Sequence, residues 1–453
     1  MLKKVETKLV SQILSLFVLA SAVGTAIAQE QQVTELEEVV VVGSQIRGAS
    51  ITGALPVTVL SLDDIAVTGA TSGDELLRSI PQIGAVGFNE SRTTGVNAAR
   101  GDVNSINLRG LGTGNTLVLL NGRRMVLHPG TQTENFTPVV TTNSNTLPVG
   151  GLQRIEVLRD GAAALYGTDA VAGVINYKLK DDYEGSEFSV RYGTSLGTEL
   201  DEITVSGSTG LVFNGGKTHL SLSASYYDKT GFDADERDYS RSSDLRGFFA
   251  DDPLFAGDTQ LDNRSSIHGW GEFIFGGGIG RQNLRPTNLT RDNGQTFDAG
   301  DCSFQLSADI CLDSGGGDRA LRGDRNSVRQ ISPDSDRQNV FAFLTHDFDN
   351  GLEFYSELGY YKAQVNRTRE QAGILSNSRF TVPASYYYNP LGPVRFADGR
   401  LNPNRIAAAG DANVPDDGVS FQLRTFAPYD VGSRRIQVDD DSLRLVAGLK
   451  GDW

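Results

Sequence analysis

Cysteine and histidine are scarce in this sequence of 453 residues. The only cysteines, Cys302 and Cys311, share one polar segment, which is compatible with a local disulfide in an oxidising compartment or with two unpaired thiols. The 4 histidines are scattered, which argues against a His-based metal or catalytic centre. We therefore predict no catalytic residue, no metal ligand and no cofactor.

Long apolar runs and excess basic charge are also missing. After residue 28 no stretch reaches the roughly 18 consecutive apolar residues of a membrane-spanning helix, so none is expected in the mature part. Lysine and arginine total 41 against 56 aspartates and glutamates, and the net charge of −15 argues against a nucleic-acid partner. The 52 glycines and 14 prolines suit sheets and tight turns better than long helices.

The first 28 residues have the pattern of a secretory signal peptide. Three lysines precede a mostly apolar stretch from Leu9 to Val23, and small residues at 26–28 fit the cleavage rule. A retained membrane anchor is the alternative, but the serines and the glutamine make the stretch a weak permanent span.

Short apolar strands and glycine turns follow one another in residues 106–177. Residues 118–120 run into Asn121-Gly122, the pair that favours a type I′ hairpin turn. Residues 154–158 alternate charged and apolar side chains as a strand does, and residues 162–166 have the length of one helical turn. The region predicts a small α+β unit.

The residues before position 106 have local signals of their own. The pattern there predicts a strand at 56–60, a helix cap at Ser61, an apolar stripe of Leu76, Leu77 and Ile80, and a loop at 84–103. A second loop is expected at 128–146.

Three stretches, Ile106 to Gly112, Thr116 to Arg124 and Leu147 to Asn176, resemble in content and order the plug domain of TonB-dependent outer-membrane receptors. The resemblance covers residues 35–180. Its charged residues could pair with the wall of a barrel or be solvated structural charges, and both interpretations stay open. The plug positions that the resemblance implies are Arg109, Gly110, Asn121, Gly122, Arg154, Glu156, Arg159, Gly167 and Gly173.

A run of valines follows a short acidic lead near the N-terminus. The run is typical of an exposed edge strand that pairs with a partner. In the family this position resembles the TonB box, which adds as a strand to TonB in the periplasm; an ordinary first plug strand is the alternative. Because the lead is short, transport is favoured over transcriptional signalling. The residues expected to contact TonB are Glu37, Glu38, Val39, Val40, Val41 and Val42.

From about Gly185 onward, apolar and polar residues alternate with a period of two. Strands of this kind, apolar outside and polar inside, are typical of a transmembrane β-barrel with a wet lumen. Asn214-Gly215-Gly216 and Asp349-Asn350-Gly351 predict tight hairpins on one side, and the acidic segments 231–336 and 367–440 predict long loops on the other. The alternating runs lie near 188–192, 203–206, 220–227, 340–348, 352–361 and 443–450.

The predicted fold class is a membrane β-barrel with an N-terminal α+β plug domain. The family barrel has 22 strands, whereas about six are expected here, too few to enclose a plug. The sequence is therefore expected to be truncated within the barrel, near Trp453. The expected organisation is signal peptide 1–28, periplasmic TonB-box-like segment 29–50, plug 51–180 and N-terminal part of the barrel 181–453.

The expected function is that of a TonB-dependent receptor in the outer membrane of a Gram-negative bacterium. It would bind a scarce extracellular solute and import it into the periplasm with energy relayed by TonB. Expected partners are TonB, outer-membrane lipid and a small solute such as an oligosaccharide or an iron chelate. The acidic, aromatic segment 231–336 favours a neutral or carbohydrate-like ligand.

Two other classes of function are alternatives to import. A surface protein that binds ligand or adheres without transport is the main alternative. An enzyme is not expected, because the one nucleophile-elbow pattern, from Gly193 to Gly197, is flanked by alternating strands and is better explained as a hairpin loop.

Overall fold

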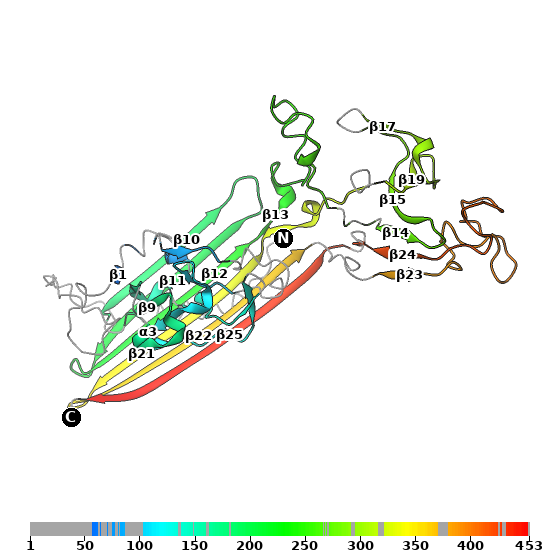
Figure 1. The fold of residues 1–453 in the computed structure, drawn as a ribbon. Coiled ribbons are helices and arrows are strands. Elements are labelled where there is room, and N and C mark those ends of the chain that lie inside the picture. Colours follow the sequence, from blue (N-terminus) through cyan, green and yellow to red (C-terminus); the bar gives the residue numbers. More distant parts are fainter. Residues whose placement is uncertain are drawn as a thin grey trace.

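The computed structural model contains a plug, a long sheet and a separate group of loop strands at one end of that sheet (Figure 1). The signal peptide and the segment Glu37 to Val42 lie outside the described residues. The structure describes residues 57–451 with gaps at 62–63, 65–69, 71–74, 78–79, 81, 87–102, 135–136, 148, 160–162, 181–182, 266, 268, 270, 291–294, 316–320, 370–378, 425 and 428–431.

The plug is built on a five-stranded sheet, in which β4 runs parallel to β9 and the other neighbours are antiparallel. The predicted stripe of Leu76, Leu77 and Ile80 is confirmed, because all three side chains are buried in the core that forms on this sheet. The strands, in sheet order, are β1 (Val57–Leu60), β8 (Leu152–Leu158), β9 (Gly173–Leu179), β4 (Thr116–Leu120) and β5 (Arg123–Arg124).

Local turn chemistry sets the connections of the plug. Asn121 and Gly122 have φ angles of 50° and 75°, as a type I′ turn between β4 and β5 requires, so this prediction is confirmed. The backbone N–H of Ser61 donates to Asp64 at 2.9 Å, and the Asp64 N–H donates back to the Ser61 hydroxyl at 3.4 Å, the reciprocal pattern of a capping box. The predicted helical turn is α3 (Ala163–Tyr166).

Short elements complete the plug. The hairpin of β6 (Gln132–Glu134) and β7 (Thr137–Val139) lies within 128–146, where we predicted only a loop. Each strand contains a threonine, which favours the strand conformation, but runs of 3 residues are too short for a periodic signal. The remaining elements are η1 (Glu75–Leu77), β2 (Ile83–Gly84), β3 (Asn107–Leu108), η3 (Thr113–Asn115), η4 (Ser144–Thr146), η5 (Val149–Gly151) and η6 (Thr168–Ala170).

The long sheet, which we call the wall, has six antiparallel strands in chain order. Both predicted hairpin turns are present, with Asn214, Gly215, Gly216 and Gly351 at positive φ. The wall strands are β10 (Gly185–Thr194), β11 (Asp201–Phe213), β12 (Thr218–Thr230), β21 (Asp334–Asp347), β22 (Leu352–Arg369) and β25 (Arg434–Gly451).

The two faces of the wall differ as the alternation predicted. Outward positions are apolar and exposed, as for Leu443, Leu445 and Leu449 on β25, whereas inward positions carry serine, arginine and glutamate. On β11 the outward positions from Phe213 to Ile203 extend about 34 Å along the strand, at about 3.4 Å per residue. With the tilt of about 35–45° that barrel strands have, this length spans about 24–28 Å, which matches their apolar band of about 25 Å.

No helix in the described part of the chain has the length and apolar character to span a membrane.

The two long connections of the wall are residues 231–333 and 370–433. They are shorter than predicted at some ends, because β21, β22 and β25 extend through polar residues such as Arg367 and Arg434 that hide the alternation. The connections are not plain loops. We call them together the loop domain, since β14 of the first pairs with β24 of the second (Figure 1).

The loop domain has a six-stranded sheet and a hydrophobic core of its own, which includes Phe275, Leu312, Val414 and Phe421. Its strands are too short to show a periodic pattern, so they could not be predicted from the sequence. Cys302 and Cys311 form a disulfide with Cα atoms 5.9 Å apart. In sheet order the strands are β18 (Phe304–Gln305), β19 (Ile310–Asp313), β15 (Gly280–Pro286), β14 (Glu272–Phe275), β24 (Phe421–Arg424) and β23 (Phe380–Val382).

Smaller elements stand beside this sheet. The pairs are β13 (Phe232–Asp233) with β20 (Gln330–Ser332) and β16 (Leu289–Thr290) with β17 (Thr296–Phe297), and the 3-10 turns are η7 (Ala234–Glu236), η8 (Thr259–Leu261), η9 (Ala299–Asp301) and η10 (Asn326–Val328).

Candidate functional site at the contact between plug and wall

A buried carboxylate of the wall holds an arginine of the plug. Glu357 on β22 is 0% exposed, and its Oε1 accepts a hydrogen bond from Nη1 of Arg123 at 2.8 Å. Its Oε2 accepts from Nε and Nη2 of Arg444, on the neighbouring strand β25, at 3.2 and 3.1 Å. The Arg123 guanidinium also lies 4.9 Å from the ring centroid of Tyr355. Both oxygens of the carboxylate are thus paired with cations, as a buried charge requires.

A second wall carboxylate binds the plug on β25. Asp440 accepts a hydrogen bond from the Asn143 side chain at 3.1 Å, and Nε2 of His128 lies 3.6 Å from the same oxygen. The Asn143 side chain also accepts from the backbone N–H groups of Asn104 and Asn145, at 3.2 and 3.1 Å. Asp440 therefore joins the wall to a plug segment that is itself held in place.

The contact between plug and wall also includes neutral and apolar groups. The Asn339 side chain donates to the carbonyl of Thr146 at 3.0 Å, and Phe341 and Phe343 of the wall belong to the plug's hydrophobic core. Lys180, where the plug meets β10, donates to Glu187 at 2.8 Å. A cavity of 160 Å³ remains between the parts, with Met125, Leu127, Phe341, Tyr361, Asp440 and Arg444 in its lining.

The predicted plug charges Arg154 and Glu156 lie on β8 and pair with each other. Glu156 is 0% exposed; it accepts from Nε of Arg154 at 2.9 Å and from the Asn176 side chain at 3.0 Å. The structure therefore gives these two residues a role in joining β8 to β9. Arg109 has φ 60°, and its guanidinium donates to the carbonyl of Arg159 at 3.3 Å, so these two predicted arginines also meet within the plug.

The predicted glycines and Asn121 hold backbone geometry. Gly173 has φ 140°, and a Cβ there would lie 2.4 Å from the Leu158 carbonyl oxygen and 2.5 Å from Leu108. The Asn121 side chain accepts from the backbone N–H of Leu179 at 2.9 Å. Gly110, Gly122 and Gly167 have φ angles of 70°, 75° and 85°.

Sequence reasoning missed Glu357, Asp440 and Arg444. Glu357 and Arg444 belong to the alternating runs that predicted their strands, but no sequence pattern identified them as residues that contact the plug. Arg123 and Glu357 are 234 residues apart, so only the assembled fold shows that they meet. The available signal was an ionisable side chain, Glu357, between Tyr355 and Gly359 on the inward face of β22.

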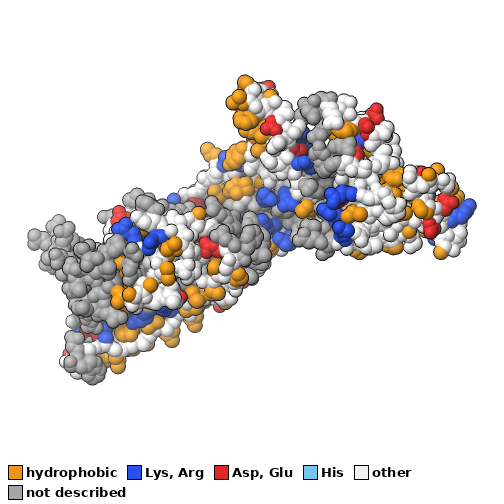
Figure 2. All heavy atoms as spheres, in the orientation of Figure 1, with side chains coloured by type: hydrophobic (Ala, Val, Ile, Leu, Met, Phe, Trp, Pro, Cys, Tyr) orange, Lys and Arg blue, Asp and Glu red, His pale blue; other side chains and the backbone are white. Residues whose placement is uncertain are grey.

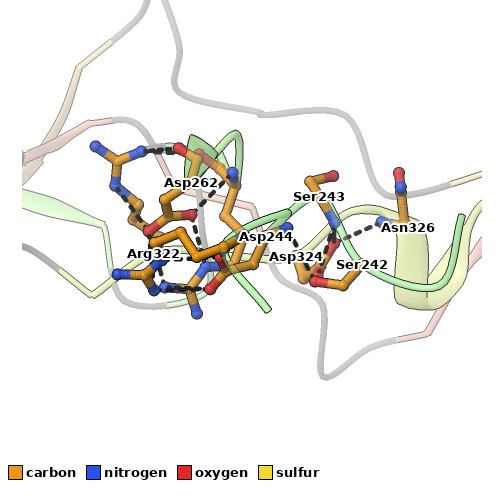
Figure 3. Close-up of polar contacts among 9 residues, drawn as sticks. Ser242, Ser243, Asp244, Asp262, Arg322, Asp324 and Asn326 are labelled. Atoms are coloured by element: carbon orange, nitrogen blue, oxygen red, sulfur yellow. Dashed lines mark hydrogen bonds and ion pairs between the residues drawn. The ribbon is translucent and has the colours of Figure 1, made fainter. Parts of the chain in front are cut away.

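A separate charge network holds the first connection of the loop domain (Figure 3). Arg246 donates to Asp244 at 2.8 and 2.7 Å, and Arg264 donates to Asp262 at 2.9 Å through each of two nitrogens. The guanidinium of Arg322 donates to the carbonyl of Asp262 at 2.9 Å. Three arginines therefore surround two carboxylates.

The pKa values of this network follow from its contacts. Hydrogen bonds from Arg246 hold the pKa of the Asp244 carboxyl below its usual value. Burial opposes this for Asp262, but the hydrogen bonds and charge of Arg264 prevail and lower its pKa as well. Asp324, nearby, accepts from the backbone N–H groups of Ser243 and Asn326 at 3.1 Å each. In the described part of the chain, no group of three or more His, Cys, Asp or Glu residues could hold a metal ion.

Comparison with known proteins gives a family-model match and several related structures. The family model of the TonB-dependent Receptor Plug Domain matches residues 51–174. A ferric enterobactin receptor of Pseudomonas aeruginosa is 17% identical over 70% of this chain and 42% of its own, with a TM-score of 0.35. The siderophore receptor PirA of Acinetobacter baumannii is 17% identical over 71% and 41%, with a TM-score of 0.36. The ferric citrate transporter FecA is 16% identical over 72% and 42%, with a TM-score of 0.34. The chain thus spans less than half the length of these three proteins.

Proposed function

We propose, from the premise that the chain belongs to the family of TonB-dependent outer-membrane receptors, that it imports a scarce extracellular solute into the periplasm. Energy would be relayed by TonB, which would pair with the segment Glu37 to Val42 as an added strand. The proposal places the protein in the outer membrane of a Gram-negative bacterium. Its parts would be signal peptide 1–28, TonB-contacting segment 29–50, plug 51–180 and barrel residues 181–453.

The observation that carries this proposal is the buried contact of Glu357 with Arg123 and Arg444. It fastens the plug to the inward face of the wall, where a solute would have to pass. Separating Arg123 from the buried carboxylate leaves the charge of Glu357 without full compensation; because Arg123 is 40% exposed and Arg444 remains, the cost is below the about 3–5 kcal/mol of a fully buried pair. Such a contact suits a plug that stays closed until a partner applies force.

A photo-crosslinking experiment in the native host tests the TonB segment without knowledge of the solute. A photoreactive phenylalanine derivative would replace Val40, and a matched control would carry it at Asn350, in a wall turn on the same predicted side of the membrane. We expect Val40 to crosslink to TonB and Asn350 not to do so. Absence of the TonB adduct at Val40, or an equal adduct at both positions, would contradict the proposal.

A deletion of Glu37 to Val42 separates transport from surface binding alone. An importer loses energised uptake and retains binding at the cell surface. A non-transporting binding or adhesion protein shows binding that depends neither on this segment nor on the proton gradient. Uptake that persists undiminished in the deletion variant would refute the role of the segment.

A further inference from the structure

A histidine of the plug faces a carboxylate of the wall at the cavity between the two parts. Nε2 of His128 lies 3.6 Å from the Asp440 carboxylate, and both side chains are only 13% exposed. Both residues belong to the lining of the cavity of 160 Å³. A separation of 3.6 Å is too long for a hydrogen bond, so the strength of this contact depends on whether the imidazole carries a charge.

The backbone beside His128 accommodates its ring in both protonation states. Nδ1 accepts a hydrogen bond from the backbone N–H of Gly130 at 3.0 Å, which leaves the proton of the neutral ring on Nε2, the nitrogen that faces Asp440. The carbonyl oxygen of Gly130 lies 3.4 Å from the same Nδ1 and can accept from it when the ring is charged. The ring can therefore gain a proton without turning away from the wall.

The other ionisable groups around the cavity do not compete for His128. The Arg444 guanidinium binds Glu357, and a phenol such as that of Tyr361 does not change charge between about pH 5 and 8. Tyr360 and Asp441 occupy outward positions of β22 and β25. On the third neighbouring strand, β21, the lining residues are Asn339 and Phe341, which do not titrate. Asp440 is thus the carboxylate with which a charged His128 pairs.

The pair lies on the aqueous side of the wall. The outward face of β25 carries exposed apolar residues such as Leu443 and Leu445, and Figure 2 shows hydrophobic side chains along this edge of the wall. Asp440 is on the opposite, inward face. The cavity beside it is lined in part by polar side chains such as Asn143 and Asn339. His128 therefore exchanges protons with the medium that fills the lumen.

The same carboxylate is bound by a second part of the plug. Asp440 accepts from the Asn143 side chain, which in turn accepts from the backbone N–H of Asn145 at 3.1 Å. The backbone N–H of His128 donates to the Thr141 carbonyl at 2.8 Å, so residue 128 and residues 141–145 are joined. A stronger attraction between His128 and Asp440 would hold this whole segment to β25.

We propose that His128 and Asp440 form a proton-sensitive latch, which fastens the plug to the wall more firmly in acid than at neutral pH. Histidine is the side chain that ordinarily gains its charge between about pH 8 and 5. A charged ring beside Asp440 is favoured when the plug is closed, so protons stabilise the closed state, and this stabilisation is lost as pH rises. As a regulator of import the latch rests on the proposed function, whereas the contact itself belongs to the closed fold.

Hydrogen exchange of the purified full chain in detergent micelles tests the latch. Each rate is divided by the intrinsic exchange rate at the same pH, which gives a protection factor. For the backbone N–H groups of Ser144 and Asn145 we expect about fivefold greater protection at pH 5.5 than at pH 7.5, the effect of one ion pair. Protection in β15 of the loop domain should not change. Equal protection of Ser144 and Asn145 at both pH values would overturn the proposal.

Matched variants assign the effect to this pair. His128→Gln and Asp440→Asn should each abolish the difference between the two pH values. His219→Gln is the control, because His219 lies on β12 outside the contact and bonds to the Gly216 carbonyl at 3.1 Å; it should retain the difference. Because each variant is compared with itself at two pH values, a general loss of stability does not imitate the result. A difference that persists in His128→Gln would overturn the proposal.

The outcome is separate from that of the crosslinking experiment at Val40. Greater protection in acid without a TonB adduct at Val40 would mean that the proposed function fails and the latch stands. A TonB adduct at Val40 together with protection that does not depend on pH would overturn the latch alone.

Discussion

The contact between plug and wall and the loop domain both rely on paired charges, but they pair them over very different distances in sequence. Glu357 binds Arg123 and Arg444 across separations of 234 and 87 residues. In the loop domain, Arg246 binds Asp244 and Arg264 binds Asp262, each across 2 residues. The difference implies that the loop domain is held together locally, whereas the plug contact exists only in the assembled fold. The two regions should therefore fail independently.

Loss of the Glu357 carboxylate should have the largest effect. Glu357→Ala leaves the guanidinium groups of Arg123 and Arg444 without their shared anion; because Arg123 is 40% exposed, we expect local destabilisation of at most about 3–5 kcal/mol. Hydrogen exchange in β4 and β5 measures this as faster opening of the plug edge. The control is Glu353→Ala, because the pair of Glu353 and Lys450 is partly exposed and worth no more than about 1 kcal/mol. Unchanged exchange in Glu357→Ala would show that the carboxylate does not fasten the plug.

Removal of the disulfide should affect only the loop domain. The double variant Cys302→Ser and Cys311→Ser opens a loop with a sequence separation of 9, for which loop entropy predicts a loss of about 2–3 kcal/mol. We expect faster hydrogen exchange in β15 and β19. The exchange rates in β4 and β9 should not change. Reduction of the unmodified protein should reproduce this pattern. Spread of the effect to the plug would disprove the independence of the two regions.

A substitution at the tightly packed Gly173 should destabilise the plug and leave the loop domain unchanged. Gly173→Ala introduces a Cβ that meets the Leu158 carbonyl oxygen, in a backbone conformation that L-residues rarely adopt, so we expect a loss of about 1–3 kcal/mol. Exchange should rise in β8 and β9 but not in the loop domain. Gly122→Ala is the control for backbone strain alone, since no atom lies within 4 Å of its added Cβ. Equal effects of both variants would mean that the close approach at Gly173 is unimportant.

Acid should loosen the loop domain slightly. The pKa values of Asp244 and Asp262 are lowered in the folded protein, so the stability they contribute is full above their unfolded value of about 3.9 and is lost as pH falls through the folded value. Because both carboxylates are partly exposed, we expect only a few tenths of a kcal/mol from each. Protease cleavage within residues 240–265, compared at pH 3 and pH 5, measures the effect. The double variant Asp244→Asn and Asp262→Asn should lose this difference between the two pH values.

Features that depend on neighbouring residues could be predicted from the sequence. The type I′ turn at Asn121-Gly122, the stripe of Leu76 and Leu77 and the alternating wall strands all follow from short-range patterns, and the structure confirms them. The pairing of β14 with β24 could not be predicted, because two strands of 4 residues meet across a long separation. Glu357 could not be predicted as the partner of Arg123 for the same reason, since the two residues are 234 positions apart.

Energy-dependent exposure of the plug tests the central claim most directly. Ser144 of the plug and Val414 of the loop domain are both 0% exposed, so Ser144→Cys and Val414→Cys place one free thiol in the core of each region. We would measure maleimide labelling of both variants in cells with and without a proton gradient. The account predicts faster labelling of Cys at 144 only in energised cells that retain Glu37 to Val42, and no such dependence at 414. An equal labelling rate at 144 with and without the gradient would contradict a plug that opens under force from TonB.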